Sequence, residues 1–232
     1  MGGKLSTTPS PAVDTWLCPG ADYPQGMSYD GYDVVAEAYA NHFPGMEPEE
    51  PAELGALARF AAEVGAGGLV LDAGCGAGRV AGHLRSLGLR CVGVDLSPGM
   101  LAMARRDHPW LPTAVATITH LPIETGSVDG VMFWFSTIHI DDRDLDRALL
   151  EAARVLRPGG AVIAGFQTGD GPREVGEGYR ELGLDVRMLR YHRRVAWMVD
   201  RFEQSGLWVI ESVDAPPTKD GGDGIGVVLG RR

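Results

Sequence analysis

The chain has 232 residues, of which 44% are hydrophobic and 22% are charged, which suits an α/β domain that buries its own core. The formal net charge of −10 argues against nucleic acid as the substrate, because proteins that bind phosphate backbones favour a basic surface. Three widely spaced cysteines form no zinc or disulfide pattern, and no apolar run could cross a membrane, so we expect a cytoplasmic protein without a membrane segment.

Residues 1–27 are rich in Ser, Thr, Pro and Gly, and we expect a flexible tail there, ahead of a domain that spans residues 28–232. Apolar residues at helical spacing then predict two helices, at 32–43 and 53–64. Beyond them, strands and helices alternate. The expected strands are 69–71, 91–94, 113–117, 128–135 and 161–166, and the expected helices are 79–87, 98–107, 144–156 and 194–204.

The last two expected strands, 208–213 and 225–229, have no helix between them, so a glycine-rich hairpin is the natural connection. Strands that alternate with helices at this spacing indicate a parallel sheet covered on both faces. The chain order therefore predicts an α/β fold with a doubly wound, seven-stranded, mostly parallel sheet and an antiparallel C-terminal strand.

A glycine-rich turn joins the first expected strand to the helix that follows it. Gly74, Gly76 and Gly78 permit a tight turn and a close approach of backbone to a ligand, and the helix offers unpaired N–H groups. Asp72 ends the strand, where its carboxylate can reach a cationic ligand. Asp95 ends the next strand, where an acid can bind both hydroxyls of a ribose. The pattern predicts a nucleoside-containing cofactor at the carboxyl edge of the sheet.

Residues 70–79, with the sequence Val-Leu-Asp-Ala-Gly-Cys-Gly-Ala-Gly-Arg, resemble motif I of the class I (Rossmann-like) S-adenosylmethionine (SAM)-dependent methyltransferases. Segments 92–100, 116–122, 133–139 and 154–160 resemble later motifs of that family, so the likeness runs from about residue 29 to the C-terminus. The resemblance implies a Rossmann-like fold, SAM as cofactor, S-adenosylhomocysteine as product and no metal. The cofactor contacts that it implies are Asp72, Gly74, Cys75, Gly76, Gly78, Asp95, Leu96, Met100, Thr117, Ile118 and Phe135.

One loop departs from the family pattern. Many relatives carry an Asp that holds the adenine amine, whereas this chain has Thr117 followed by Ile118. We expect the backbone and the Thr117 hydroxyl to hold the amine, and Ile118 to pack on the ring. A nicotinamide cofactor fits less well, because those enzymes usually space their glycines Gly-x-Gly-x-x-Gly and this chain has Arg79 at the last position.

His139 follows the fourth strand at the carboxyl edge of the sheet, where ligands bind in open α/β folds. It is either a general base for the acceptor or a loop histidine bonded to backbone, and the sequence leaves both interpretations open. We expect Phe135 to border the cofactor or acceptor. Because successive strand residues point to opposite faces, we do not expect Trp134 to face the same pocket.

The segment after the fifth strand, near 168–191, is too long for a plain link and is the expected acceptor cap, with a short strand within 184–190. Tyr32, Gln167 and Arg187 are the expected acceptor contacts. We therefore expect an enzyme that transfers a methyl group from SAM to oxygen or nitrogen of a small-molecule acceptor. An RNA or protein methyltransferase and a non-catalytic SAM-binding regulator or partner subunit stay open as alternatives, and the sequence fits a monomer or a homodimer.

Overall fold

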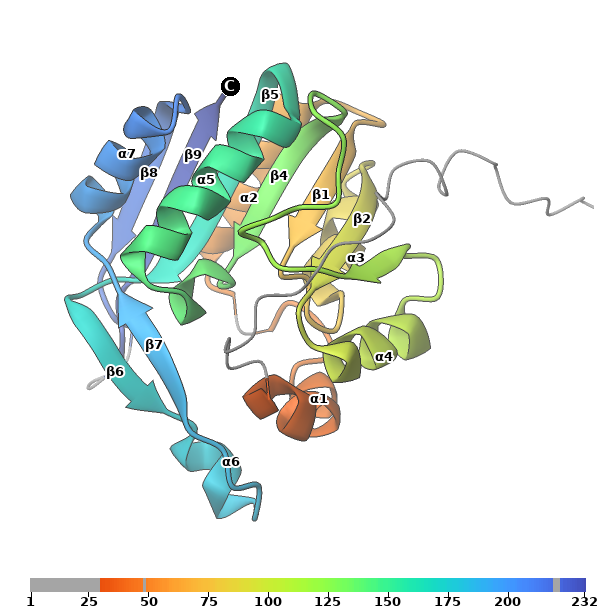
Figure 1. Cartoon of the computed structure of the whole chain (residues 1–232), viewed down its shortest axis with the longest axis vertical. Helices are drawn as coiled ribbons and strands as arrows, with labels where there is room; N and C mark the ends of the chain where they lie inside the picture. The colour runs from red at the N-terminus through yellow and green to blue at the C-terminus, as the bar shows by residue number, and fades with distance from the viewer. Residues whose placement is uncertain (1–29, 48, 219–221) are drawn as a thin grey trace, which may run out of the picture.

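A computed structural model describes residues 30–47, 49–218 and 222–232 (Figure 1). The tail predicted at residues 1–27 lies outside the described residues, so its boundary with the domain stays a prediction. Within the described ranges, no helix has both the length and the apolar character needed to cross a membrane.

A seven-stranded sheet forms the centre of the protein, in the order β3-β2-β1-β4-β5-β9-β8 (Figure 1). Its strands are β1 (Leu69–Ala73), β2 (Arg90–Asp95), β3 (Thr113–Val115), β4 (Val128–Trp134), β5 (Leu156–Gln167), β8 (Trp208–Ala215) and β9 (Ile225–Arg231). β9 runs antiparallel to both β5 and β8, and the remaining strand pairs of this sheet are parallel. The predicted Rossmann-like, doubly wound fold is confirmed.

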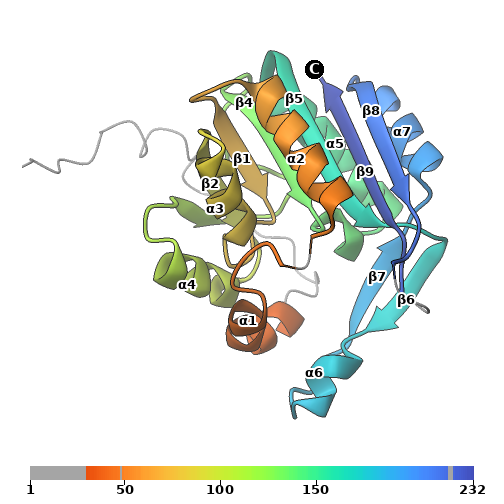
Figure 2. The same ribbon diagram turned by 180° about the vertical axis from the view of Figure 1, so that it is seen from behind.

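Helices cover both faces of this sheet (Figures 1 and 2). α2 (Pro51–Val64) and α3 (Arg79–Ser86) share one buried cluster with one face, and α5 (Asp142–Val155) and α7 (Val195–Gln204) share another with the opposite face. α1 (Asp30–His42) and α4 (Pro98–Asp107) pack against each other near the carboxyl ends of the strands. Two separate apolar layers therefore hold the sheet rigid between them.

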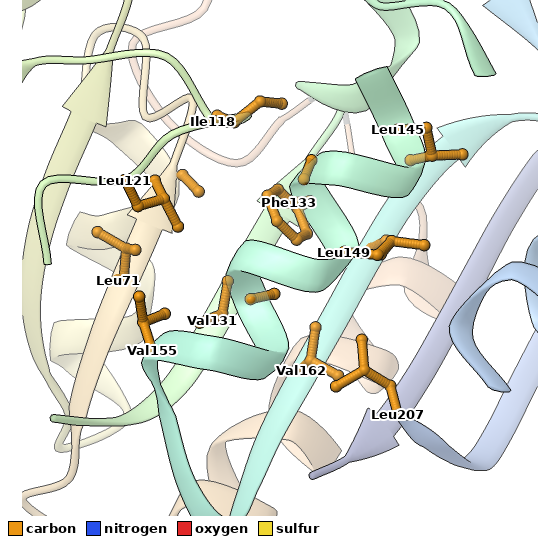
Figure 3. Close-up of a cluster of buried hydrophobic side chains, with 14 of the residues drawn as sticks. Leu71, Ile118, Leu121, Val131, Phe133, Leu145, Leu149, Val155, Val162 and Leu207 are labelled. Carbon is orange, nitrogen blue, oxygen red and sulfur yellow. The ribbon is translucent and has the colours of Figure 1, made fainter. Parts of the chain in front are cut away.

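The contact between α5 and the sheet shows how the sequence specifies this arrangement (Figure 3). Leu145 and Leu149 lie one turn apart on α5, are fully buried, and belong to the same cluster as Phe133 of β4. Each buried leucine stabilises the fold by about 1.5–3 kcal/mol relative to an exposed one. Asp141 caps the helix by accepting from the Asp144 N–H at 2.9 Å, so α5 begins slightly earlier than its apolar pattern predicts.

The cap consists of β6 (Gly171–Val175), α6 (Glu177–Glu181) and β7 (Met188–His192), and it extends beyond the main sheet (Figure 1). β6 and β7 pair as a two-stranded antiparallel sheet. The strand expected within 184–190 therefore lies slightly later in the chain. Its partner β6 was not predicted, because four of its five residues are exposed and it has no apolar alternation. Val35 of α1 packs on Val186 and Met188, which joins α1 to the cap.

Candidate active site

The glycine turn between β1 and α3 opens the carboxyl edge of the sheet. Gly74, Gly76 and Gly78 have φ angles of 86°, 52° and 82°, a backbone conformation that glycine adopts at little cost. A Cβ at Gly74 would lie 2.2 Å from the Cβ of Ser136, whereas a Cβ at Gly76 would meet nothing within 4 Å. The Gly74 N–H donates to the Val94 carbonyl at 2.8 Å, which fixes the turn beside the end of β2. The turn thus presents bare backbone to open space at Gly76.

Asp95 lies at the end of β2 and connects this turn to the next loop. Its Oδ2 accepts from the Gly76 N–H at 2.8 Å, and its Oδ1 accepts from the Ser97 N–H at 2.9 Å. Burial raises the pKa of Asp95, and these backbone hydrogen bonds oppose the rise. Each carboxylate oxygen has a second lone pair, so Asp95 can still accept hydrogen bonds from a vicinal diol.

Asp72, near the end of β1, is 1% exposed, and its Oδ2 has no hydrogen-bond partner within the described chain. Desolvation is the main cause that raises the pKa of Asp72 from 3.8 to about 7, and the Asp95 carboxylate adds to the rise. A buried carboxylate is costly unless a cation or a donor meets it. Because Asp72 lines the cavity described next, its unpartnered oxygen fits a ligand ammonium.

A cavity of about 960 Å³ lies at the carboxyl edge, bordered by the glycine turn, α1 and the cap. Its volume is near the top of the range of roughly 300–1,000 Å³ for small-molecule sites. The predicted residues that line it are Tyr32, Asp72, Gly74, Cys75, Gly76, Asp95, Leu96, Met100, Thr117, Ile118, Phe135, His139 and Gln167. The structure therefore brings most of the expected contacts to one cavity.

Two predicted residues lie away from this cavity. Gly78 forms the N-cap of α3, and a Cβ there would lie 3.0 Å from the Leu111 side chain, so Gly78 shapes the turn. The Arg187 side chain is 72% exposed and lies 3.8 Å from Glu174, whereas Arg190 lines the cavity. β7 begins at Met188, so Arg187 precedes the strand and Arg190 lies within it, and the sequence did not reveal where that strand begins.

The loop after β3 places Thr117 and Ile118 on the cavity. The Thr117 hydroxyl lies 2.8 Å from the Thr119 hydroxyl and accepts from the Thr119 N–H at 3.2 Å. Ile118 is 8% exposed and packs in the cluster under α5 (Figure 3). Thr117 is thus already bonded within its own loop. Its predicted contact with an adenine amine stays a prediction.

His139 ends η1 (Thr137–His139), a short 3-10 helix after β4, and both of its ring nitrogens are engaged. Nδ1 lies 2.8 Å from the Leu189 carbonyl, and because a carbonyl only accepts, Nδ1 carries the proton. Nε2 lies 2.7 Å from the Tyr32 hydroxyl, which then donates to it. Burial lowers the pKa of His139, and the Arg190 charge lowers it further. Nδ1 is thus bonded to backbone, while Nε2 accepts a hydrogen bond from Tyr32, and the role of His139 as a general base stays a prediction.

Trp134 and Phe135 both line the cavity, so the expectation that they would point to opposite sides is wrong. The reason is the φ of 55° at Phe135, which ends β4 and breaks the alternation of an extended strand. A bulky residue in this conformation costs about 1–3 kcal/mol, and such strain concentrates at ligand sites. The strained residue thus turns a second aromatic side chain towards the cavity.

Two arginines line the cavity, and each is bonded to a carboxylate. Arg79 donates to both oxygens of Glu49 at 2.6 and 2.7 Å, and the Glu49 side chain is 1% exposed. Arg190 bonds Asp223, which also accepts from Arg173 at 2.8 Å. These pairings could not be predicted, because Glu49 and Asp223 lie in loops without periodicity. Over the residues that the structure covers, no group of three His, Cys, Asp or Glu side chains could hold a metal ion.

The chain matches a family model, and it is similar to curated proteins over part of its length. Residues 71–164 match the family model described as a methyltransferase domain. A malonyl-[acyl-carrier protein] O-methyltransferase of Yersinia pestis is 36% identical over 50% of this chain and 43% of its own length. A demethylmenaquinone methyltransferase of Streptomyces avermitilis is 34% identical over 40% of each chain. The match thus spans less than half the length of these relatives.

Solved structures resemble the chain over more of its length. The 1,6-didemethyltoxoflavin-N1-methyltransferase of Burkholderia thailandensis, with bound 1,6-didemethyltoxoflavin and S-adenosylhomocysteine, has a TM-score of 0.64 and 19% identity, and covers 91% of this chain and 93% of its own. A SAM-dependent methyltransferase of Mesorhizobium loti has a TM-score of 0.61 and 20% identity, with coverage of 77% and 96%. At this identity the likeness establishes the fold.

Proposed function

We propose that this protein, a class I SAM-dependent methyltransferase by its fold and by the match of residues 71–164, transfers a methyl group from SAM to an uncharged small molecule. The observation that carries the proposal is the unpartnered Oδ2 of Asp72, in one cavity with Asp95 and the Gly76 backbone. Together these groups offer a carboxylate for an ammonium, an acid for a ribose diol and backbone for close contact. When bound, SAM supplies an activated methyl group, and the protein supplies alignment and exclusion of water.

The residues around the cavity divide into two halves. On the cofactor half, Asp72 holds the amino-acid ammonium and Asp95 holds the ribose. Leu96 and Met100 border the ribose and adenine, and the loop with Thr117 and Ile118 borders the ring. On the acceptor half lie Tyr32, Phe135, His139, Gln167 and Arg190, together with apolar residues of the cap. The cap is therefore the part of the chain that selects the acceptor.

Tyr32 and His139 supply the route for the acceptor's proton. The Tyr32 hydroxyl already donates to His139 Nε2 at 2.7 Å. When the acceptor's O–H or N–H bond breaks, its proton passes to the Tyr32 oxygen while the original phenol proton forms an N–H bond on Nε2. The protonated imidazole then returns this proton to solvent, which its lowered pKa favours. Nitrogen or oxygen acceptors that must lose a proton are the ones that this pair serves.

The charges around the cavity favour an uncharged acceptor. Arg79 and Arg190 are the two arginines of its lining, and Glu49 and Asp223 already balance them. Among the described residues of the lining, both arginines are therefore already paired with a carboxylate, and Arg190 Nε is left without an acceptor. The cap side is lined by Val175, Tyr179, Leu182 and Met188, which suits an apolar ring or chain. The acceptors named for the two relatives differ from each other, so similarity over part of their length does not choose one.

The experiment uses purified protein, SAM with a tritiated methyl group, and a small-molecule extract of the host cell. We expect label in an extractable small molecule together with stoichiometric S-adenosylhomocysteine, and much less transfer with Asp95→Ala at a SAM concentration near the wild-type dissociation constant. Label that appears in RNA or protein instead would support the first alternative. Calorimetric binding of SAM without any S-adenosylhomocysteine would support the non-catalytic alternative, and absence of SAM binding would refute the proposal altogether.

A further inference from the structure

Arg193 follows β7 and is 5% exposed, yet it does not line the cavity. Its guanidinium uses all three nitrogens. Nη1 donates to the Thr137 carbonyl at 2.9 Å, Nη2 to the Ile140 carbonyl at 2.6 Å, and Nε to Asp142 Oδ1 at 3.1 Å. The two carbonyls lie on either side of His139 in the chain, so Arg193 bonds both the first residue of η1 and the residue that follows it.

The segment that carries His139 needs such an external support. η1 is only three residues long, and the Ile140 N–H reaches the Thr137 carbonyl at a weak 3.5 Å. The imidazole itself is bonded through Nδ1 to the Leu189 carbonyl, which belongs to β7. Tyr32 of α1 fixes Nε2, and the two other groups that hold His139 from outside its own segment, Leu189 and Arg193, come from the same stretch of chain at the end of the cap.

We propose that Arg193 is the positioning residue of the His139–Tyr32 pair: it holds η1 so that Nδ1 stays on the Leu189 carbonyl and the unprotonated Nε2 stays on the Tyr32 hydroxyl, able to take up a proton. This inference rests on the proposed function for its kinetic consequences, but its geometry does not. A planar guanidinium can bond two carbonyls and a carboxylate at once, whereas a lysine ammonium at the same place reaches fewer of them.

The surroundings of Arg193 support a fixed orientation of its guanidinium. Tyr191 and Trp197 lie on it with ring centroids 5.4 and 5.8 Å from its central carbon. Its salt-bridge partner, Asp142, has a side chain that is 65% exposed, so the carbonyls are the buried acceptors. A buried cation bonded to neutral carbonyls costs free energy unless those bonds are well made. The main role of the Arg193 guanidinium is therefore to bond the carbonyls of the η1 segment, and its ion pair with Asp142 is secondary.

The first test measures the tautomer of the His139 ring and does not require methyl transfer. Protein labelled with ¹⁵N-histidine and saturated with S-adenosylhomocysteine is compared by NMR as wild type, Arg193→Lys and Arg193→Met, with the His139 signals assigned by His139→Gln. We expect the wild-type ring to be the neutral tautomer protonated at Nδ1. Both Arg193 variants should show averaging between the two tautomers. A tautomer that is unchanged in folded Arg193→Lys overturns the proposal.

The second test is kinetic. We expect Arg193→Lys to lower kcat by about 10–100-fold, because a misplaced group of this kind loses alignment. The acid limb of its pH–rate profile should shift, and its dissociation constant for SAM should stay within about twofold of wild type. The groups that face His139 and could alter that limb are Tyr32 from α1, and Arg190 and the Leu189 carbonyl from β7. A lower kcat with an unchanged pH profile would overturn the positioning role.

Two control variants keep the result interpretable. Arg201 also lies on Trp197, with its central carbon 5.5 Å from the ring, and pairs with Asp146 at 3.5 Å, but it has no contact with η1. Arg201→Lys should therefore keep the wild-type tautomer and kcat. Asp142→Asn removes the charged partner of Arg193 and leaves both carbonyl bonds, so it should behave like wild type. If wild type binds SAM but methylates nothing, the proposed function fails while the tautomer comparison still decides the role of Arg193.

Discussion

Replacing Asp72 with asparagine tests whether the buried, unpartnered carboxylate of Asp72 lowers the stability of the folded protein when no ligand is bound. Asp72 is 1% exposed with an unpartnered oxygen, and burial raises its pKa from 3.8 to about 7. Between these values the folded protein keeps a proton that the unfolded chain has released. The free energy of unfolding should therefore fall as the pH rises through this window, and Asp72→Asn should not share that fall.

The size of the effect follows from the pKa difference. A rise from 3.8 to about 7 is roughly three pH units, and at 1.36 kcal/mol per unit it corresponds to about 4 kcal/mol. At pH 8, where Asp72 is ionised in both states, Asp72→Asn should be more stable than wild type by up to about 4 kcal/mol. Near pH 4 most of that difference should disappear, because both side chains are then neutral in the folded state.

Urea denaturation of wild type and Asp72→Asn at pH 4, 6 and 8 measures this directly. The matched control is Asp214→Asn, because Asp214 is exposed on the edge strand β8 and should show no pH-dependent gain. The reasoning is refuted if the difference between wild type and Asp72→Asn is the same at all three pH values. A difference that grows with pH in the control as well would assign the effect to net charge.

The same residue predicts how SAM binding depends on pH. A ligand ammonium stabilises the ionised form of Asp72, so SAM binding near pH 6 should release a proton and the affinity should rise towards pH 8. Calorimetry in buffers with different ionisation enthalpies detects the released proton. Asp72→Asn should bind more weakly and release none. Equal proton release by both proteins would place the ammonium elsewhere.

Three further substitutions test the remaining site assignments. Asp95→Ala removes charge-assisted hydrogen bonds of roughly 1.5–3 kcal/mol each, so calorimetry should show SAM affinity at least tenfold lower in a folded protein. Gly76→Val places a branched side chain in open space at a φ of 52° and should abolish SAM binding with a stability loss of about 1–2 kcal/mol; normal binding would move the pocket. His139→Ala should lower turnover by about 10²–10⁴-fold at unchanged SAM affinity. Because burial lowers the pKa of His139, the wild-type rate should fall only below the ordinary imidazole value of about 6.5, and a variant that retains this acid limb would exclude His139 as the base.

The parts of the fold that sequence predicted are those that short-range physics determines. The apolar runs of β1 and β4 and the glycine turn are local patterns. The proposed cofactor half of the cavity follows from them, because parallel strands bring Asp72 and Asp95 to the same edge of the sheet. Two adjacent strand ends and one turn are sufficient to place this half.

The parts that sequence missed depend on contacts between distant segments. Arg187 and Arg190 look alike in the sequence, and only the pairing of β7 with β6 decides that Arg190 faces the cavity. Glu49 is buried because Arg79 and the Trp134 indole, which donates to it at 3.1 Å, surround it from other elements. Phe135 has a φ that no local propensity favours. The misplaced Arg187 and the unexpected turn at Phe135 both lie on the proposed acceptor half.

Under the proposed function, the two parts of the cap differ in how far a substitution there can change the choice of acceptor without disturbing His139. The outer part of the cap contributes apolar lining such as Leu182, which is 70% exposed and so packs little against other residues. The inner part, at the end of β7, holds η1 through Leu189 and Arg193 while Arg190 lines the cavity. Substitutions in α6 and at Leu182 just after it should therefore reshape the proposed acceptor site and leave His139, the proposed proton acceptor, in place. Substitutions at the end of β7 alter the acceptor site and the orientation of His139 together, so acceptor specificity should be easier to change from α6 than from β7.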